Sequence, residues 1–252
     1  MRFTRALSAV VGATTALLSA FALTALAPAA SAAPARDAGG VEPYIIGGGT
    51  ASDAPWAARL FRDGQQNCSA TIIAPTWVLT AQHCVASSGT YTFRIGSLDQ
   101  TSGGTMATAT QIIQHPSVDL ALARLDRSVA GTYAPLGTTT AVQVGQTVQL
   151  YGWGATCTNQ PEINCQSRYL KYANTRVTSV NGRDYRGGTA ISVSRIDGIA
   201  AGGDSGGPMF ATSPVDGRRY QVGVASTSDR SSRSNYTAVT RYRDWIRSYA
   251  GV

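Results

Sequence analysis

The chain has 252 residues and a formal net charge of +7, from 21 Lys and Arg against 14 Asp and Glu. The arginines are isolated from one another and form neither a basic helix nor a patch interleaved with aromatic residues. This distribution indicates a solvated basic face and argues against a nucleic-acid partner. Beyond the first 32 residues no segment is long and apolar enough to span a bilayer, which argues against a membrane protein.

The N-terminus has the pattern of a secretory signal peptide. Arg2 and Arg5 give a basic start, an Ala, Leu and Val-rich stretch follows, and Ala30-Ser31-Ala32 has the small-x-small form of a cleavage site. A membrane anchor is the alternative, but Ser, Gly and Thr dilute the stretch and Pro28 interrupts it. We therefore expect residues 1–32 to be a signal peptide and the protein to be secreted to the extracellular space.

After this segment, short apolar runs alternate with Gly, Ser, Thr and Asn, a pattern typical of an all-β protein. Strands are predicted at 69–73, 77–80, 91–95, 106–114 and 120–125, and then at 147–152, 170–180, 208–211, 221–226 and 236–239. Residues 128–140 lack periodicity, and we place the crossover between two halves there. Residues 241–249 carry aromatic and aliphatic side chains at helical spacing and predict the one helix of any length.

The segment Gly203-Asp204-Ser205-Gly206-Gly207-Pro208 places a serine among glycines. An alcohol is a poor nucleophile until a neighbouring base takes its proton, so a reactive serine needs a histidine and the histidine needs a carboxylate. The glycines leave the backbone open, so the N–H groups of Gly203 and Ser205 can point at one developing oxyanion. This pattern indicates a site for acyl transfer.

The order of residues along the chain selects the type of site. The segment also fits G-x-S-x-G, the elbow of the α/β-hydrolases, but that fold needs its histidine after the serine. The chain has only two histidines, His83 and His115, and both precede Ser205. The remaining order is His, then Asp, then Ser.

His83 is the predicted base, because it follows the strand-like run 77–80, whereas His115 precedes a proline in a predicted loop. Asp119 leads into an apolar strand, where a buried carboxylate needs a partner that His83 can supply. Asp99 and Asp126 remain alternatives for the carboxylate.

Together with these residues, three further motifs support a family assignment: Ile45-Ile46-Gly47-Gly48, Gly152-Trp153-Gly154 and Tyr242-Arg243-Asp244-Trp245-Ile246. The chain resembles the trypsin/chymotrypsin-like serine proteases, secreted bacterial members in particular, over nearly everything after residue 44. The resemblance implies two packed six-stranded antiparallel β-barrels with a C-terminal helix, a protease domain at 45–252 and a pro-segment at 33–44.

The resemblance also implies roles for the motif residues. His83, Asp119 and Ser205 would form the catalytic triad of a serine endopeptidase that works through an acyl-enzyme, with His83 and Asp119 on the first barrel and Ser205 on the second. Gly203 and Ser205 would form the oxyanion hole. Cleavage before Ile45 would create an ammonium that pairs with Asp204. No cofactor is required.

Four cysteines allow three pairings, and an exported chain is expected to oxidise them. The resemblance matches Cys68 with Cys84, which leaves Cys157 with Cys165. Neither the cysteine spacing nor the supply of histidines suits a zinc site, so no metal is expected.

Substrate binding is expected to involve Ile199, Ser226, Thr227, Ser228 and Ser234. Ile199 stands where trypsin-like members carry an aspartate, so Arg and Lys are expected to bind poorly at the cleavage position and small to medium apolar residues better. A two-residue insertion would instead bring Asp197 into the pocket and restore a preference for basic residues. The chain also departs from the family at Gln82, where an alanine is usual, and at Ala201, where a cysteine is usual.

Two alternatives to an endopeptidase remain: an esterase or narrow-specificity protease of the same fold, and a catalytically silent binding protein. The expected partners are polypeptide substrates, with room for a protein inhibitor, and the protein is expected to be a monomer without nucleic acid or membrane partners.

Overall fold

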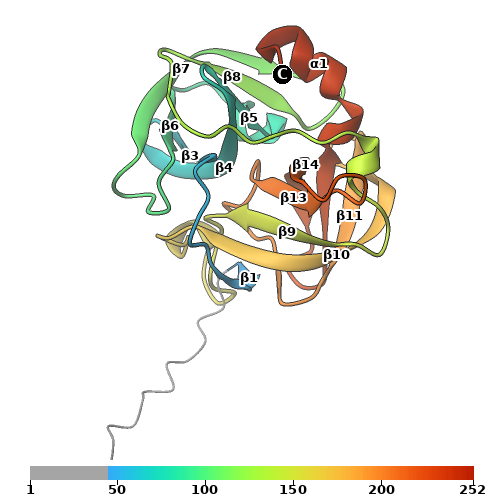
Figure 1. Cartoon of the computed structure of the whole chain (residues 1–252). Coiled ribbons are helices and arrows are strands. Elements are labelled where there is room, and N and C mark those ends of the chain that lie inside the picture. The colour runs from blue at the N-terminus through green and yellow to red at the C-terminus, as the bar shows by residue number, and fades with distance from the viewer. Residues whose placement is uncertain (1–44) are drawn as a thin grey trace, which may run out of the picture. The chain divides into compact units, whose positions relative to one another are not determined.

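The structure is a computed structural model that describes residues 45–252, so the expected signal peptide and pro-segment lie outside the described residues. The described chain folds into two six-stranded antiparallel β-barrels followed by a short C-terminal helix (Figure 1), which confirms the expected fold. Within residues 45–252 no helix is both long and apolar enough to cross a membrane.

The first barrel closes in the strand order β3, β4, β5, β8, β7, β6. Its strands are β3 (Ala57–Arg62), β4 (Gln65–Ala74), β5 (Trp77–Thr80), β6 (Tyr91–Ile95), β7 (Thr105–Gln114) and β8 (Ala121–Leu125). Burial alternates along β6, where Tyr91, Phe93 and Ile95 face the core and the residues between them are half-buried. This period of two is the reason that the run forms a strand.

The second barrel runs in the order β11, β15, β14, β13, β9, β10, and pairing of β10 with β11 closes it. Its strands are β9 (Thr147–Gly152), β10 (Lys171–Arg183), β11 (Thr189–Arg195), β13 (Pro208–Thr212), β14 (Arg219–Ser228) and β15 (Arg233–Ala238). A short strand β2 (Gly49–Thr50) adds to the edge of β10. Separately, β1 (Ile46–Gly47) pairs with β12 (Gly198–Ile199).

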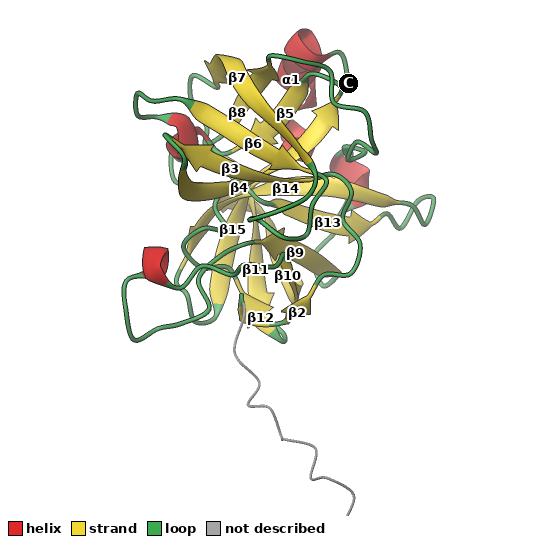
Figure 2. Cartoon of the chain, turned by 90° about the vertical axis from the view of Figure 1, so that its left-hand side faces the viewer, coloured by secondary structure: helices red, strands yellow, loops and turns green. Residues whose placement is uncertain are grey.

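Figure 2 shows the two barrels one above the other, with the strands of each seen from the side. The segment between β8 and β9 joins the two barrels and includes the predicted crossover region and a short 3₁₀ turn, η2 (Thr139–Ala141). Helix α1 (Arg243–Ala250) follows β15 through another turn, η4 (Val239–Arg241), and lies beside the first barrel in Figure 1. The fully buried Ile246 belongs to the same apolar cluster as the core of the first barrel, so the C-terminus ties the two barrels together.

All four cysteines form disulfides, Cys68 with Cys84 and Cys157 with Cys165. The first joins β4 to the turn η1 (Gln82–Val85), which carries His83. In the chain-entropy picture, closing a loop of this size stabilises the fold by about 3 kcal/mol.

Candidate active site

His83 and Asp119 lie side by side in the first barrel. His83 stands in η1, directly after β5, and Asp119 lies just before β8, which pairs with β5. The His83 ring nitrogen Nδ1 is 2.8 Å from Asp119 Oδ2, and the His83 backbone N–H donates to Asp119 Oδ1 at 3.0 Å. The carboxylate is fully buried, whereas the imidazole is 29% exposed. Asp119 therefore holds one edge of the ring inside the protein and leaves the other edge accessible.

A third donor reaches Asp119 from the second barrel. Ser226 Oγ, on β14, donates to Asp119 Oδ2 at 2.6 Å. Burial by itself would raise the pKa of Asp119, but the hydrogen bonds from His83 and Ser226 outweigh burial and lower the pKa below its ordinary value. An ionised carboxylate can only accept hydrogen bonds, so Nδ1 of His83 carries a proton, and in the neutral imidazole the lone pair then lies on Nε2.

Ser205 sits on a turn that both barrels hold in place. Its carbonyl oxygen accepts the backbone N–H of Ser69 on β4 at 2.9 Å, and Gly206 N–H donates to the Ala225 carbonyl on β14 at 2.9 Å. Gly206 has a φ of +78°, and a Cβ there would lie 2.1 Å from Thr80 Oγ1. Only glycine fits this position, because both the backbone conformation and the approach of β5 exclude a side chain.

The backbone around Ser205 presents two unused donors. Gly203 adopts a φ of +100°, and its carbonyl oxygen accepts hydrogen bonds from Ser69 Oγ at 2.9 Å and from Arg59 Nη1 at 3.2 Å. Within the described part of the chain, neither the Gly203 N–H nor the Ser205 N–H donates to another residue. Two free backbone N–H groups close to a serine hydroxyl are the donors that an oxyanion-binding site requires.

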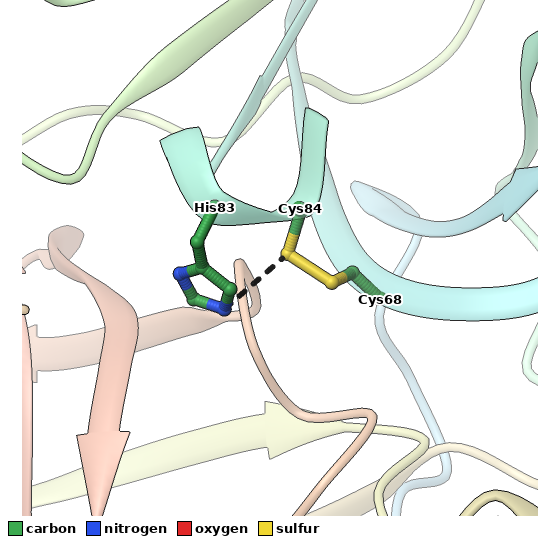
Figure 3. Close-up of side chains that lie close together, drawn as sticks. All are labelled: Cys68, His83 and Cys84. Carbon is green, nitrogen blue, oxygen red and sulfur yellow. Dashed lines mark hydrogen bonds between the residues drawn. A yellow bond between two sulfur atoms is a disulfide. The ribbon is translucent and has the colours of Figure 1, made fainter. Parts of the chain in front are cut away.

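His83 and Ser205 line the same pocket, which has a volume of about 450 Å³. Among residues 45–252 no hydrogen bond joins His83 Nε2 to Ser205 Oγ; Nε2 instead lies 3.8 Å from Cys84 Sγ (Figure 3). Hydrogen bonds between catalytic groups are often long in the free enzyme and shorten when substrate binds. The pocket brings the imidazole and the hydroxyl together without closing the contact between them.

Cys68, His83 and Cys84 also place three metal-type ligand atoms within 4.8 Å of one another. Both sulfur atoms belong to one disulfide, as Figure 3 shows, so neither is the thiolate that a metal ion binds. These three atoms lie close together because the Cys68–Cys84 disulfide is next to His83.

The rest of the pocket is lined mainly by small side chains. Ser226, Thr227 and Ser228 on β14 form one wall, and Ala200–Gly202 form a second wall. Ser228 Oγ donates to the Ala200 carbonyl at 2.6 Å and so joins the two walls. Of the residues expected to bind substrate, Ser226, Thr227 and Ser228 line this pocket.

Ile199 and Ser234 lie outside the lining of this pocket. Ile199 is fully buried and pairs with Ile46 of β1, and Ser234 is buried on β15 opposite Ser228. The Asp197 carboxylate turns away as well, since it accepts the backbone N–H of Asn174 at 2.7 Å and the Asn174 side-chain amide at 2.5 Å. None of these three side chains supplies a charge to the pocket.

The two pocket residues with large polar side chains, Tyr185 and Arg230, were not predicted from the sequence. The ring of Tyr185 lies 6.1 Å from the His83 ring, centroid to centroid, and the Tyr185 backbone N–H donates to Ser226 Oγ at 2.9 Å. Arg230 also lines the pocket and forms an ion pair with Glu162, with contacts of 2.5 and 3.0 Å. Both residues lie in polar loops without a motif, so no sequence signal distinguished them.

Asp204 lies on the inner side of the Ser205 turn and is fully buried. Its carboxylate accepts the backbone N–H groups of Gly154 at 2.7 Å and Ala201 at 2.9 Å. Burial raises the pKa of Asp204 to about 7, although these hydrogen bonds act in the opposite direction. Ile45 is also fully buried, directly before the strand β1 that pairs with β12.

The Gly152-Trp153-Gly154 motif packs directly on this carboxylate. A Cβ at Gly152 would lie 2.1 Å from Asp204 Oδ1, and one at Gly154 would lie 2.1 Å from Asp204 Oδ2. Neither approach leaves room for a side chain.

The remaining candidates have structural contacts. His115 Nδ1 accepts two loop N–H groups, and its ring packs against Trp245 with centroids 4.9 Å apart. Asp99 pairs with Arg168 at 2.8 Å, and Asp126 pairs with its neighbour Arg127 at 2.7 Å. Gln82, next to His83, donates to the side chain of Gln114 at 2.6 Å.

Comparison with known proteins identifies related chains and the same fold. A profile of the family described as Trypsin matches residues 45–246. An uncharacterized peptidase of Corynebacterium glutamicum (strain R) is 28% identical over 236 residues, covering 91% of this chain and 77% of that protein. Trypsin alpha-4 of Lucilia cuprina is 30% identical over 229 residues, covering 82% of this chain and 87% of that protein. The solved structure titled human heparin binding protein shares the fold, with a TM-score of 0.69 at 24% identity over 81% of this chain and 96% of that one.

Proposed function

Because the chain belongs to the trypsin family of serine endopeptidases, we propose that it is a secreted enzyme that cuts polypeptides through Ser205, His83 and Asp119. The observation that carries the proposal is the buried 2.8 Å contact between Asp119 and His83, with the exposed edge of the imidazole in the same pocket as Ser205. The two disulfides support an oxidising extracellular location.

In the proposed reaction Ser205 Oγ attacks the substrate carbonyl carbon while His83 Nε2 takes the hydroxyl proton. Asp119 stabilises the imidazolium that forms, and the Gly203 and Ser205 N–H groups receive the developing oxyanion. When the tetrahedral intermediate collapses, His83 gives the proton to the leaving amine. Water then attacks the acyl-enzyme, with His83 as base, and returns the hydroxyl of Ser205.

We propose that the enzyme cleaves peptide bonds that follow small, uncharged residues. The Ser228 Oγ bond to the Ala200 carbonyl crosses between the two walls of the pocket, and such a bridge limits the depth available to a side chain. No carboxylate lines this pocket among the described residues, so an Arg or Lys side chain would be desolvated there without a partner.

Activation is proposed to follow cleavage between Tyr44 and Ile45. The buried position of Ile45 and the buried, weakly compensated carboxylate of Asp204 support a pairing between Asp204 and a new ammonium at Ile45. The pair would fix the turn that carries the oxyanion donors.

The test is labelling and cleavage by the purified secreted protein. We expect a fluorophosphonate to label the enzyme with the Ser205→Ala variant unlabelled, and a peptide library to be cut after small residues. No labelling of a folded, correctly cleaved protein would identify a silent scaffold. Labelling with ester hydrolysis but no peptide cleavage would identify an esterase.

A further inference from the structure

A buried arginine of the first barrel reaches the catalytic turn of the second. Arg59 lies on β3 and is fully buried. Its Nη1 donates to the Gly203 carbonyl at 3.2 Å, and its Nη2 donates to the side-chain oxygen of Gln166. The guanidinium therefore links β3 to the turn that contains Ser205 and to the loop before β10.

Burying this charge is costly. Burial lowers the pKa of Arg59 to about 9, with interaction with Asp204 acting in the opposite direction, and because this value is still above 7 the guanidinium stays charged at neutral pH. Its Nε is buried with no hydrogen-bond partner among the described residues. A buried and incompletely paired charge destabilises a fold, and an apolar side chain of similar volume often does not. Packing alone does not account for an arginine at this position.

The contact that Arg59 makes bears on the oxyanion donors. Gly203 adopts a φ of +100°, and its carbonyl points into the protein, toward Arg59 and Ser69. Holding that oxygen inside fixes the peptide plane between Gly203 and Asp204, which lies between the two planes that carry the Gly203 and Ser205 N–H groups. The Gly203 and Ser205 N–H groups are then held free of other partners, as they are in the described chain.

We propose that Arg59 is a positioning residue of the oxyanion hole, which anchors the Gly203 carbonyl from the first barrel and so keeps the neighbouring N–H donors in place. The inference rests on the proposed peptidase function. It gives β3 a part in ordering the oxyanion hole that is independent of the ion pair between Asp204 and the ammonium of Ile45.

The test compares Arg59→Met with Arg94→Met in the cleaved, full-length enzyme. Arg94 is the cross-strand neighbour of Arg59 on β6, and it donates to the carbonyls of Gln100 and Gly103, away from Ser205. We expect Arg59→Met to lower kcat about 10- to 100-fold, somewhat less than deleting an oxyanion donor, with KM within about twofold. The rate of fluorophosphonate labelling should fall in parallel, Arg59→Lys should recover part of the loss, and Arg94→Met should match the parent.

Several results would overturn the inference. A folded Arg59→Met enzyme with the parental kcat and labelling rate would remove it while leaving the peptidase function intact, and a parent enzyme that neither labels nor cleaves would remove both. A rise in KM alone, or equal losses in Arg59→Met and Arg94→Met, would also count against it. If Arg59→Met does not fold, Gln166→Met releases the other end of the guanidinium, and we expect kcat to fall about 3- to 10-fold, the equivalent of one hydrogen bond. An unchanged kcat in that variant would contradict the proposal.

Discussion

Asp184 Oδ2 accepts the backbone N–H of Asp119 at 3.0 Å, so a carboxylate of the second barrel holds the residue that orients His83 in the first. The same oxygen accepts Thr237 Oγ1 at 3.0 Å, and Oδ1 accepts the backbone N–H groups of Arg186 at 2.9 Å and Gly188 at 2.7 Å. Asp184 is buried, and these four donors all point at it.

Replacing Asp184 by Ala would leave these donors unpaired, several of them buried, at about 1–3 kcal/mol for each buried donor that finds no water. We expect the free energy of unfolding of Asp184→Ala to fall by about 2–4 kcal/mol in urea denaturation. Asp216→Ala is the matched control, because Asp216 is exposed and accepts hydrogen bonds from two residues close to it in sequence, Arg218 in its own loop and Tyr220 at the start of β14. Equal free energies of unfolding for the two variants would show that the hydrogen bonds to Asp184 do not stabilise the fold.

The proposed triad predicts a non-additive loss of turnover. Ser205→Ala and His83→Ala should each lower kcat by about 10⁶, and the double variant should lose no more, because the two side chains act in one step. Asp119→Asn should lower kcat by about 10⁴ through loss of the correct tautomer. Asp99→Asn is the control; a larger effect there than in Asp119→Asn would transfer the carboxylate role to Asp99.

The hydrogen bond between Ser228 and Ala200 predicts the residue after which the enzyme cleaves its substrate. Ser228→Gly removes the hydroxyl that joins the two walls and should shift kcat/KM toward larger apolar side chains, by about 10- to 200-fold for each added methylene that the pocket now accepts. Peptide-library profiling measures the shift. Asp197→Ala should leave the profile unchanged, since Asn174 occupies that carboxylate. Loss of cleavage after Arg in Asp197→Ala would instead place Asp197 in the recognition of substrate.

Asp204 predicts a pH dependence that differs between the uncut and the cut chain. Its folded pKa of about 7 lies above the ordinary value of 3.8, so the folded uncut chain binds this proton more tightly than the unfolded chain does. The contribution of Asp204 to stability therefore declines as pH rises from about 4 to 7 and is constant above that. Cleavage before Ile45 should abolish this decline, because the ammonium favours the ionised carboxylate.

The ammonium should in turn have a pKa above its free value of about 7.7–8.0. Its contribution is then full below that value and is lost as pH rises through the raised pKa, so activity should fall on the alkaline side. Urea denaturation of the cut and uncut Ser205→Ala chains across pH, with N-terminal sequencing of the active enzyme, measures both effects. Identical pH profiles for the two chains, or full activity of a chain starting at Ala33, would exclude this activation.

The predicted strands that were located most accurately have strong local patterns. The runs that became β5, β6 and β9 were predicted with their observed ends, because apolar side chains dominate or alternate clearly there. Five strands of each barrel were predicted, and the strand left unpredicted was β3 in the first barrel and β11 in the second. Arg59 breaks the apolar pattern of β3. A charged side chain can be buried there because its hydrogen-bond partners, Gly203 and Gln166, come from distant parts of the sequence. In β11 small and polar residues dilute the apolar signal.

A similar division applies to the candidate site. His83, Asp119 and Ser205 were singled out because each lies in a motif whose local sequence serves its chemistry, and their catalytic roles stay predictions. Ser228 was expected to bind substrate, but its hydrogen bond to the Ala200 carbonyl depends on two segments that are far apart in the sequence. Tyr185 and Arg230 reach the pocket from loops whose course is set by contacts with Ser226 and Glu162. Local sequence patterns contain no information about such long-range tertiary contacts.

The close fit of Gly152 and Gly154 around Asp204 changes the meaning of the Gly-Trp-Gly motif. Both glycines are required by the carboxylate that lies against them, more than by any turn of their own. In a relative that has abandoned catalysis and replaced this aspartate with a smaller residue, the two positions would be free to acquire side chains. The three positions should therefore vary together, and a larger residue at either glycine would be a mark of lost enzymatic activity that is readable even where the nucleophilic serine survives.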